Sequence, residues 1–181
     1  VNGIAPQLFR NYVPTTNPTR YFPSLQYIRN NANVPPSTSG SCPSGNCLTG
    51  ELMSAITRAM TFQVVARDNR AAGGGINTAT ATVNVDGNSG PFNVTAPNTA
   101  VTWAGGSSQT ITWSVNNTTA APVSAANVKI SFSTDGGLTF PTTITASTPN
   151  DGSETVTIPN VTTTQGRIKV DASVSFGRLV M

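Results

Sequence analysis

The stretch MTFQVVARDNRAAGGGINTATATVNV, residues 60–85, alternates apolar and polar side chains on both sides of a glycine-rich centre. Its first part places Phe62, Val64 and Ala66 on one face of an extended chain, and 76–85 resumes the same period of two. A period of two is typical of a β-strand, and NRAAGGG supplies the turn residues between the two parts. The stretch therefore predicts a β-hairpin, the closing pair of strands of a sandwich domain.

Downstream of this hairpin, short alternating runs are separated by turn signals. Gln109 to Val115 is the clearest run, with Ile111, Trp113 and Val115 expected to point inward. Strand-turn spacing of roughly 8–12 residues is typical of a small β-sandwich. The runs are FNVTAP (92–97), SQTITWSV (108–115), VKISFS (128–133), TFPTTITAS (139–147), ETVTIPN (154–160) and GRIKVDASVSF (166–176).

The first 49 residues are rich in proline and asparagine, so we expect a long irregular segment there. Pro23 can open a short helical turn through SLQYIRNN. A second short helix is predicted at 48–57, with Thr49 as its cap and Glu51 in its first turn, although an extended connection competes with it.

These patterns predict an all-β protein of two tandem immunoglobulin- or fibronectin-like β-sandwich domains, with one or two short helical turns. The turn-rich DGNSGP (86–91) separates a first domain, 1–87, from a second, 91–181. We expect the first to be incomplete at its N-terminus, since Val1 starts without a convincing first strand. The second is expected to lack its last strand, because GRLVM (177–181) leaves little room for one.

Charge and composition indicate an exported protein. Only 9% of the residues are charged, whereas about 25% is usual, and the remaining surface is rich in Ser, Thr and Asn. The net charge of +3 is spread along the chain without a basic stripe, so nucleic-acid binding is not predicted. No apolar stretch approaches 18 residues, so no membrane span is predicted. We therefore expect a secreted, extracellular or cell-surface location.

The two cysteines, Cys42 and Cys47, lie close together in STSGSCPSGNCLTG. A zinc site needs about four ligands, and the chain has no histidine and no other cysteine. A small disulfide loop formed in an oxidising compartment is the preferred interpretation. Closing so short a loop would stiffen it locally and add little global stability.

The absence of histidine removes the commonest general base, the Ser-His-Asp triad and the HExxH zinc site. Paired carboxylates remain a formal possibility for glycoside hydrolysis. Four of the seven acidic residues sit in turn signals, where Asp usually binds its own backbone, and two others are expected on outward strand faces. We predict no catalytic residue in this chain; the acidic residues considered are Glu51, Asp68, Asp86, Asp135, Asp151, Glu154 and Asp171.

Calcium is the alternative cofactor that the residues leave open. NDGSE (150–154) and ARDN (66–69) each bring oxygen donors together. Because calcium takes 6–8 oxygens, and neither segment supplies that many locally, ordinary turns are the preferred interpretation. No cofactor or metal residue is therefore predicted.

STDGGLTF, residues 133–140, is similar to an Asp-box of β-propeller glycosidases. A propeller needs several four-stranded blades, and the chain holds one box, so a glycosidase is not predicted. The alternative is a hairpin turn in which Asp135 binds backbone amides while Gly136 and Gly137 supply positive φ. We expect these three residues to be structural.

Several motifs in order resemble one protein family: TFQVVARDNRAAGGGINTATATVNV, GPFNVTAPN, WAGGSSQTITWSVNNT, VKISFSTDGGLTFP, TPNDGSETVTIPN and RIKVDA. They look like the non-catalytic β-sandwich region of secreted reprolysin-like zinc metallopeptidases of Bacteroidetes. RNYVPTTNPTRYFPSLQYI resembles the stretch that precedes this region, so the similarity covers nearly the whole chain. The WAGGSSQTITW element alone is also similar to KNH-like cell-surface domains.

The resemblance implies a non-catalytic accessory module that serves as spacer, stabiliser or substrate-docking element, with the upstream catalytic domain of the parent chain as its partner. Zinc is expected only in that domain, whose HExxH site has no counterpart here. The alternative is an extracellular glycan- or surface-adhesion module, favoured if the aromatic residues of the first 27 positions form an exposed platform.

Overall fold

A computed structural model of the 181-residue chain describes residues 16, 20–30, 35–36, 38–39, 47–48, 51, 53–68, 70–71 and 73–172. In these residues one five-residue helix accompanies ten strands, and every strand pair is antiparallel. The all-β prediction is confirmed. The chain divides into two compact units, one formed by Val1–Pro18 with Pro36–Asn88 and the other by Thr19–Pro35 with Ser89–Met181.

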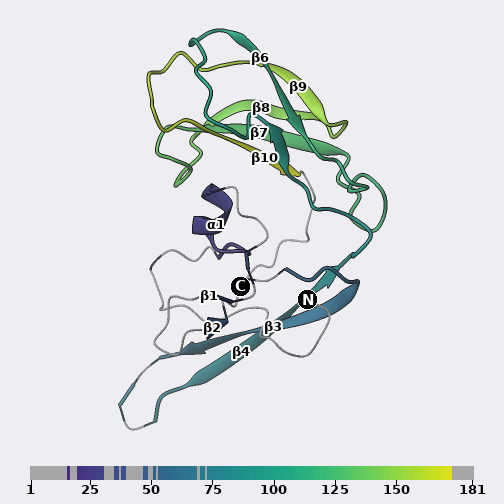
Figure 1. Cartoon of the computed structure of the whole chain (residues 1–181). Coiled ribbons are helices and arrows are strands. Elements are labelled where there is room, and N and C mark those ends of the chain that lie inside the picture. The colour runs from purple at the N-terminus through teal and green to yellow at the C-terminus, as the bar shows by residue number, and fades with distance from the viewer. Residues whose placement is uncertain are drawn as a thin grey trace. The chain divides into compact units, whose positions relative to one another are not determined.

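The first unit contains the hairpin expected from the opening stretch. Strand β3 (Arg58–Arg67) pairs with β4 (Ile76–Val85) over ten consecutive residue pairs, from Arg58 opposite Val85 to Arg67 opposite Ile76. Figure 1 shows the two strands as one long twisted ribbon. The unit also holds a two-residue ladder between β1 (Thr38–Ser39) and β2 (Cys47–Leu48).

The helix predicted at 48–57 is wrong. Glu51 forms an isolated β-bridge and is buried, 53–57 are irregular, and β3 begins at Arg58. Ser54 closes a tight local turn instead, because its hydroxyl donates to the carbonyl oxygen of Ile56. Helix propensity is a weak preference that tertiary context commonly overrides in so short a segment.

Near its turn the hairpin is exposed on both of its faces, whereas Met60 and Phe62, farther from the turn, are partly buried. Val64 on one face is 51% exposed, and Val65 on the other is 45% exposed. Ile76, at the start of β4, is 63% exposed. Cross-strand pairs such as Thr61–Thr82 and Gln63–Thr80 then supply local stabilisation on the polar face.

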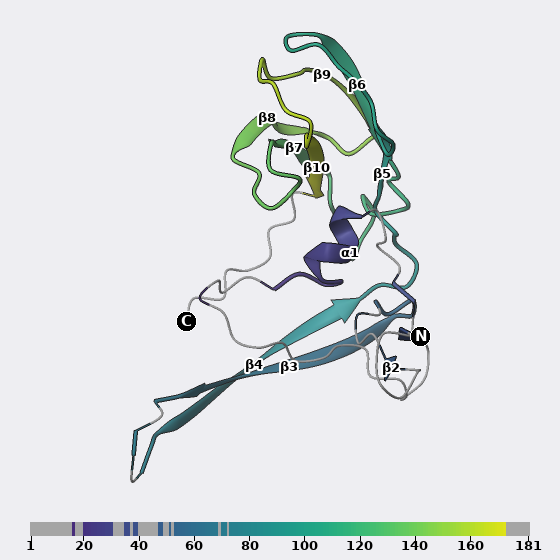
Figure 2. The same cartoon turned by 60° about the vertical axis from the view of Figure 1, so that its left-hand side comes forward.

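The second unit is built from two three-stranded antiparallel sheets, with strand orders β5-β6-β9 and β10-β7-β8. Figure 2 shows both sheets. Successive strands change sheet after β6, β8 and β9, so each sheet combines segments distant in the chain. The strands are β5 (Val94–Ala96), β6 (Ser108–Trp113), β7 (Asn127–Ser133), β8 (Thr142–Pro149), β9 (Ser153–Thr157) and β10 (Arg167–Ala172).

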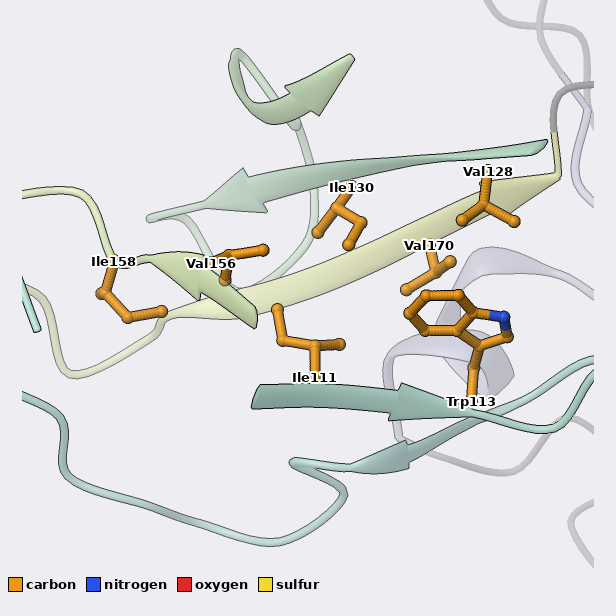
Figure 3. Close-up of a cluster of buried hydrophobic side chains, with 7 residues drawn as sticks. All are labelled: Ile111, Trp113, Val128, Ile130, Val156, Ile158 and Val170. Atoms are coloured by element: carbon orange, nitrogen blue, oxygen red, sulfur yellow. The ribbon is translucent and has the colours of Figure 1, made fainter. Parts of the chain in front are cut away.

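The core of this unit lies between the two sheets. Ile111 from β6 and Ile130 from β7 are completely buried, and their side chains point toward one another (Figure 3). Alternate residues of each strand face inward, as the period of two requires. The buried cluster is completed by Trp113, Val128, Val156, Ile158 and Val170, with Val115 partly buried against it.

A buried polar cluster closes one end of the core. The indole Nε1 of Trp113 donates to Asn150 Oδ1 at 2.8 Å, and Asn150 Nδ2 donates to Thr118 Oγ1 and to the Ala125 carbonyl oxygen. Asn150 is 4% exposed. Because every polar group of this side chain has a partner, its burial carries no unpaired group.

Helix α1 (Leu25–Arg29) belongs to the second unit, although the boundary expected from the sequence places it in 1–87. Arg29 Nε donates to the Gly136 carbonyl oxygen at 2.6 Å, a contact 107 residues apart in the chain. Local sequence predicts the helical turn after Pro23 and carries no signal for this distant partner.

Candidate functional site

Asp135 is the centre of a closed hydrogen-bond network in the turn between β7 and β8. Its carboxylate accepts bonds from the backbone amides of Leu138 and Thr139, at 2.9 and 3.0 Å. The hydroxyls of Ser133 and Thr139 donate to the same carboxylate, each at 2.6 Å. Ser133 Oγ also accepts from the Gly137 amide at 2.9 Å. The Asp-box residues thus bind one another.

This network has an electrostatic consequence. The hydroxyl bonds from Ser133 and Thr139, followed by the Thr139 amide, hold the pKa of the Asp135 carboxyl far below its usual range. Hydrogen bonds to the charged form of a carboxyl favour ionisation. A carboxylate held in its charged form is a poor general acid near neutral pH.

The same turn positions two arginines. Gly136 has φ +74° and Gly137 φ +85°, a region where L side chains are strained. A Cβ on Gly136 would lie 3.0 Å from Arg29 Nη2, and one on Gly137 would lie within 3.6 Å of Cγ atoms of both Arg29 and Arg167. The Gly136 amide also donates to the Gln165 carbonyl oxygen at 3.0 Å. The turn therefore connects α1 with the chain entering β10.

A cleft of about 900 Å³ lies in the second unit between β5 with its following loop and β10. Residues 97–103 line one wall and 166–170 line the other, and the apolar side chains of Val94, Trp103 and Ile168 are part of the lining. Its volume is that of an ordinary ligand pocket, which runs roughly 300–1,000 Å³.

The charged side chains that line the cleft are all cationic: Arg29, Arg167 and Lys169. Lys169 Nζ forms an ion pair with Asp171 at 3.0 Å and lies over the Phe140 ring. The Arg167 guanidinium donates to the neighbouring Gly166 carbonyl oxygen. Among the described lining residues there is no Asp or Glu, so their net charge is positive.

The two segments considered for calcium form turns with their own partners. Asp151 accepts from the Ser153 amide, Glu154 accepts from the Thr148 hydroxyl, and Asn150 binds Trp113. Asp68, in the second segment, accepts from the Arg70 amide at 3.1 Å. The amides of Arg70 and Gly75 lower the pKa of the Asp68 carboxyl. Within the described residues, no group of three or more acidic, histidine or cysteine side chains clusters as a metal site.

Cys47 lies in β2 opposite Ser39, whereas Cys42 lies outside the described residues, so their disulfide stays a prediction. Asp86 accepts from the Asn88 amide in the turn after β4. Asp171 lies on β10 opposite Lys129. No helix in the described part of the chain is long and apolar enough to cross a membrane.

The sequence did not predict the cleft. It is formed by residues from several separate segments, most of which carry no chemical motif. Two valines were the available indication in the sequence, because Val101 and Val161 stand in turn-rich loops where apolar side chains are not needed. In the structure both line the cleft and are about half exposed.

Comparison with known protein families, curated proteins and solved structures finds no match to this chain.

Proposed function

We propose that this chain is a non-catalytic accessory module of a secreted zinc-dependent metallopeptidase, acting as spacer, stabiliser or substrate-docking element. The observation that carries the non-catalytic role is the closed network around Asp135, the acid with the most suggestive motif. The carboxylate oxygens of Asp135 accept hydrogen bonds within the turn, and the Gly136 carbonyl oxygen of the same turn binds Arg29. Asp135 therefore has a structural role. Zinc would belong to the upstream catalytic domain.

The proposal includes two tandem immunoglobulin- or fibronectin-like sandwiches. The strand orders β5-β6-β9 and β10-β7-β8 support this for the second unit, because they correspond to the A-B-E and F-C-C′ orders of such domains. The β3–β4 hairpin would be part of the first sandwich. Thr- and Asn-rich strand surfaces and the Cys42–Cys47 pair support export.

The context is tested by sequencing the gene upstream of the Val1 codon. The proposal expects a continuous reading frame that encodes an HExxH motif. An upstream frame that encodes an unrelated domain would overturn the peptidase context, whatever the module itself binds.

The non-catalytic role is tested by incubating the full chain with fluorescent casein, with and without added zinc. We expect no hydrolysis under either condition. Hydrolysis that resists a zinc chelator and disappears in Asp135→Asn would overturn it, because a trace zinc peptidase would respond only to the chelator.

A glycan-adhesion function is favoured by two exposed aromatic side chains. Tyr21 is 41% exposed and Phe22 is 37% exposed, and the Arg20 guanidinium lies 4.7 Å from the Phe22 ring centre. Stacking on sugars would use such faces. Array binding that Tyr21→Ala and Phe22→Ala both abolish would establish adhesion in place of the accessory role.

A further inference from the structure

In the described sheet, strand β10 forms main-chain hydrogen bonds along one of its two edges. It pairs with β7 over six consecutive positions, from Arg167 opposite Ser133 to Ala172 opposite Val128. In the sheet order β10-β7-β8 it stands at the edge, and no described strand pairs with its other side. A strand edge presents backbone donors and acceptors in a row, which is a template for a further strand.

The cleft runs along this same strand. Gly166 to Val170 line one wall, and the opposite wall comes from Val94 and from 97–103. Ile158 and Trp103 add apolar surface. Val101 is 52% exposed and Val161 is 50% exposed, so the lining includes large apolar groups open to water. A chain lying here would gain both backbone hydrogen bonds and apolar contacts.

The charged side chains of the lining distinguish one end of β10 from the other. Arg167 begins β10, and Arg29 is held near it by the Gly136 carbonyl oxygen, so two guanidinium groups stand by one end of the strand. Carboxylates pair favourably with guanidinium groups, which offer two parallel donors. The other end of β10, at Ala172, contributes no charge to the lining.

We propose that the cleft beside β10 binds an extended segment of another polypeptide, which adds to β10 as an antiparallel strand. The segment has apolar side chains at alternate positions and a carboxylate that lies by Arg167 and Arg29. Like every strand pair described in this unit, the added pair is antiparallel, so the segment runs from Ala172 toward Arg167 and places the carboxylate at its C-terminal end.

A single strand fits this site better than a second copy of the chain. A second copy that paired through its own β10 edge would have to fit both of its sheets and its own 97–103 loop beside this edge. One extended strand instead lies between the two walls and leaves them in place. In strand addition of this kind, main-chain hydrogen bonds supply the affinity, and the contacts of alternate side chains supply the specificity. The inference does not depend on the parent being a peptidase.

The test uses the full 181-residue chain and a nine-residue synthetic peptide that alternates threonine and valine and ends in aspartate. Fluorescence anisotropy of the labelled peptide is expected to show saturable binding. Hydrogen exchange should then slow at alternate amides of 167–172, because those amides acquire acceptors. The same peptide with N-methylated alternate amides, which cannot pair along an edge, should not bind.

Matched variants locate the site. Val101→Asp places a charge in the lining, whereas Leu138→Asp changes an equally exposed apolar residue outside it. Only the first should weaken binding. Arg167→Glu should weaken binding about fivefold, the size of an exposed ion pair, and a peptide ending in lysine should restore it. Lys129→Glu, on β7 outside the cleft, is the control and should change nothing.

Each other outcome overturns the proposal. Equal binding of the N-methylated peptide would show that the strand edge is not used. A dimer in sedimentation that Val101→Asp dissociates would assign the cleft to a second copy. In the free monomer, protection of those amides of 167–172 that do not bond β7 would show that the edge is occupied by the chain itself. Absence of binding would remove the site.

Discussion

The β3–β4 hairpin and the second unit share one sequence pattern and differ in what surrounds it. Both consist of antiparallel strands with period-two alternation, although the register is unbroken only in the hairpin and shifts near Val94 and Ile130 in the second unit. Val64 and Val65 of the hairpin are each about half exposed, whereas Ile111 and Ile130 of the second unit have no exposed surface. Alternation therefore specifies a strand and its two faces, while burial requires a second layer.

The difference in burial shows where the stability of the described chain is concentrated. An apolar side chain contributes roughly 1.5–3 kcal/mol when it is fully buried, and little when it stays in water. The seven buried side chains around Ile111 and Trp113 gain that contribution. The hairpin relies on its main-chain ladder and on cross-strand pairs, each worth roughly 0.2–1 kcal/mol.

The largest expected effect comes from the same substitution in each region. Ile111→Ala, at a completely buried site, should lower the free energy of unfolding by about 2–5 kcal/mol, because it removes contacts and leaves a cavity. Ile76→Ala, at a site 63% exposed, should change it by no more than about 0.5 kcal/mol. Urea denaturation followed by circular dichroism measures both, and equal losses would break the comparison.

The next largest difference in stability is expected between two asparagine substitutions, one in each region. Asn150→Ala leaves the Trp113 indole N–H and the Ala125 carbonyl without this partner inside the second unit. We expect a loss of about 1–3 kcal/mol, the cost of buried unpaired polar groups. Asn77→Ala removes an exposed bond to the Thr78 amide and should be close to neutral. A shift in tryptophan fluorescence in Asn150→Ala alone would report the altered indole environment.

A smaller effect is expected in the 133–140 turn. Gly136→Ala places a side chain at φ +74° beside Arg29 and should cost about 1–2 kcal/mol, plus the displacement of α1. Gly106→Ala is the control, since its φ is +78° and nothing lies within 4 Å of the added group. Faster hydrogen exchange in α1 should occur only in Gly136→Ala. Equal exchange in both variants would show that the turn does not hold the helix.

The smallest effect is a dependence on pH. The pKa of Asp135 is lower in the folded chain than in the unfolded chain, so its contribution is complete above the unfolded value of about 3.9. Stability is then lost as pH falls through the lowered pKa. Asp135→Asn should reduce the difference between urea midpoints at pH 7 and pH 3.

Asp68 provides the hairpin counterpart of this experiment. Its pKa is also lowered, but by exposed backbone amides rather than by two hydroxyl groups. Asp68→Asn should change the pH dependence less than Asp135→Asn does. The reverse order would contradict the stronger network assigned to the 133–140 turn.

Much of the local structure could be predicted from the residues. The bounds of β4 follow from INTATATVNV, and the inward positions of Ile111 and Trp113 follow from alternation along SQTITWSV. The helical turn after Pro23 is present as α1. These features depend on neighbours close in the chain, whose side chains are visible in the sequence itself.

The features that failed or were missed depend on distant partners. At Glu51 the expected helix is replaced by a β-bridge, since tertiary context outweighs a weak local helix propensity. The cleft beside β10 needs the sheet order and the loop at 97–103 to come together, and no single segment encodes either. The Arg29–Gly136 contact spans 107 positions.

The sequence alone is enough to predict an all-β chain, most of its strands, and a turn in which Asp135 and its neighbouring hydroxyls bind one another. Period-two alternation and turn chemistry act over a few residues, so these features can be read locally. Only the tertiary structure decided which alternating strands are buried, that α1 belongs with the second unit, and that β10 stands at an edge beside an apolar, cationic cleft. Those outcomes arise from the packing of layers, in which each side chain's environment is supplied by residues elsewhere in the chain.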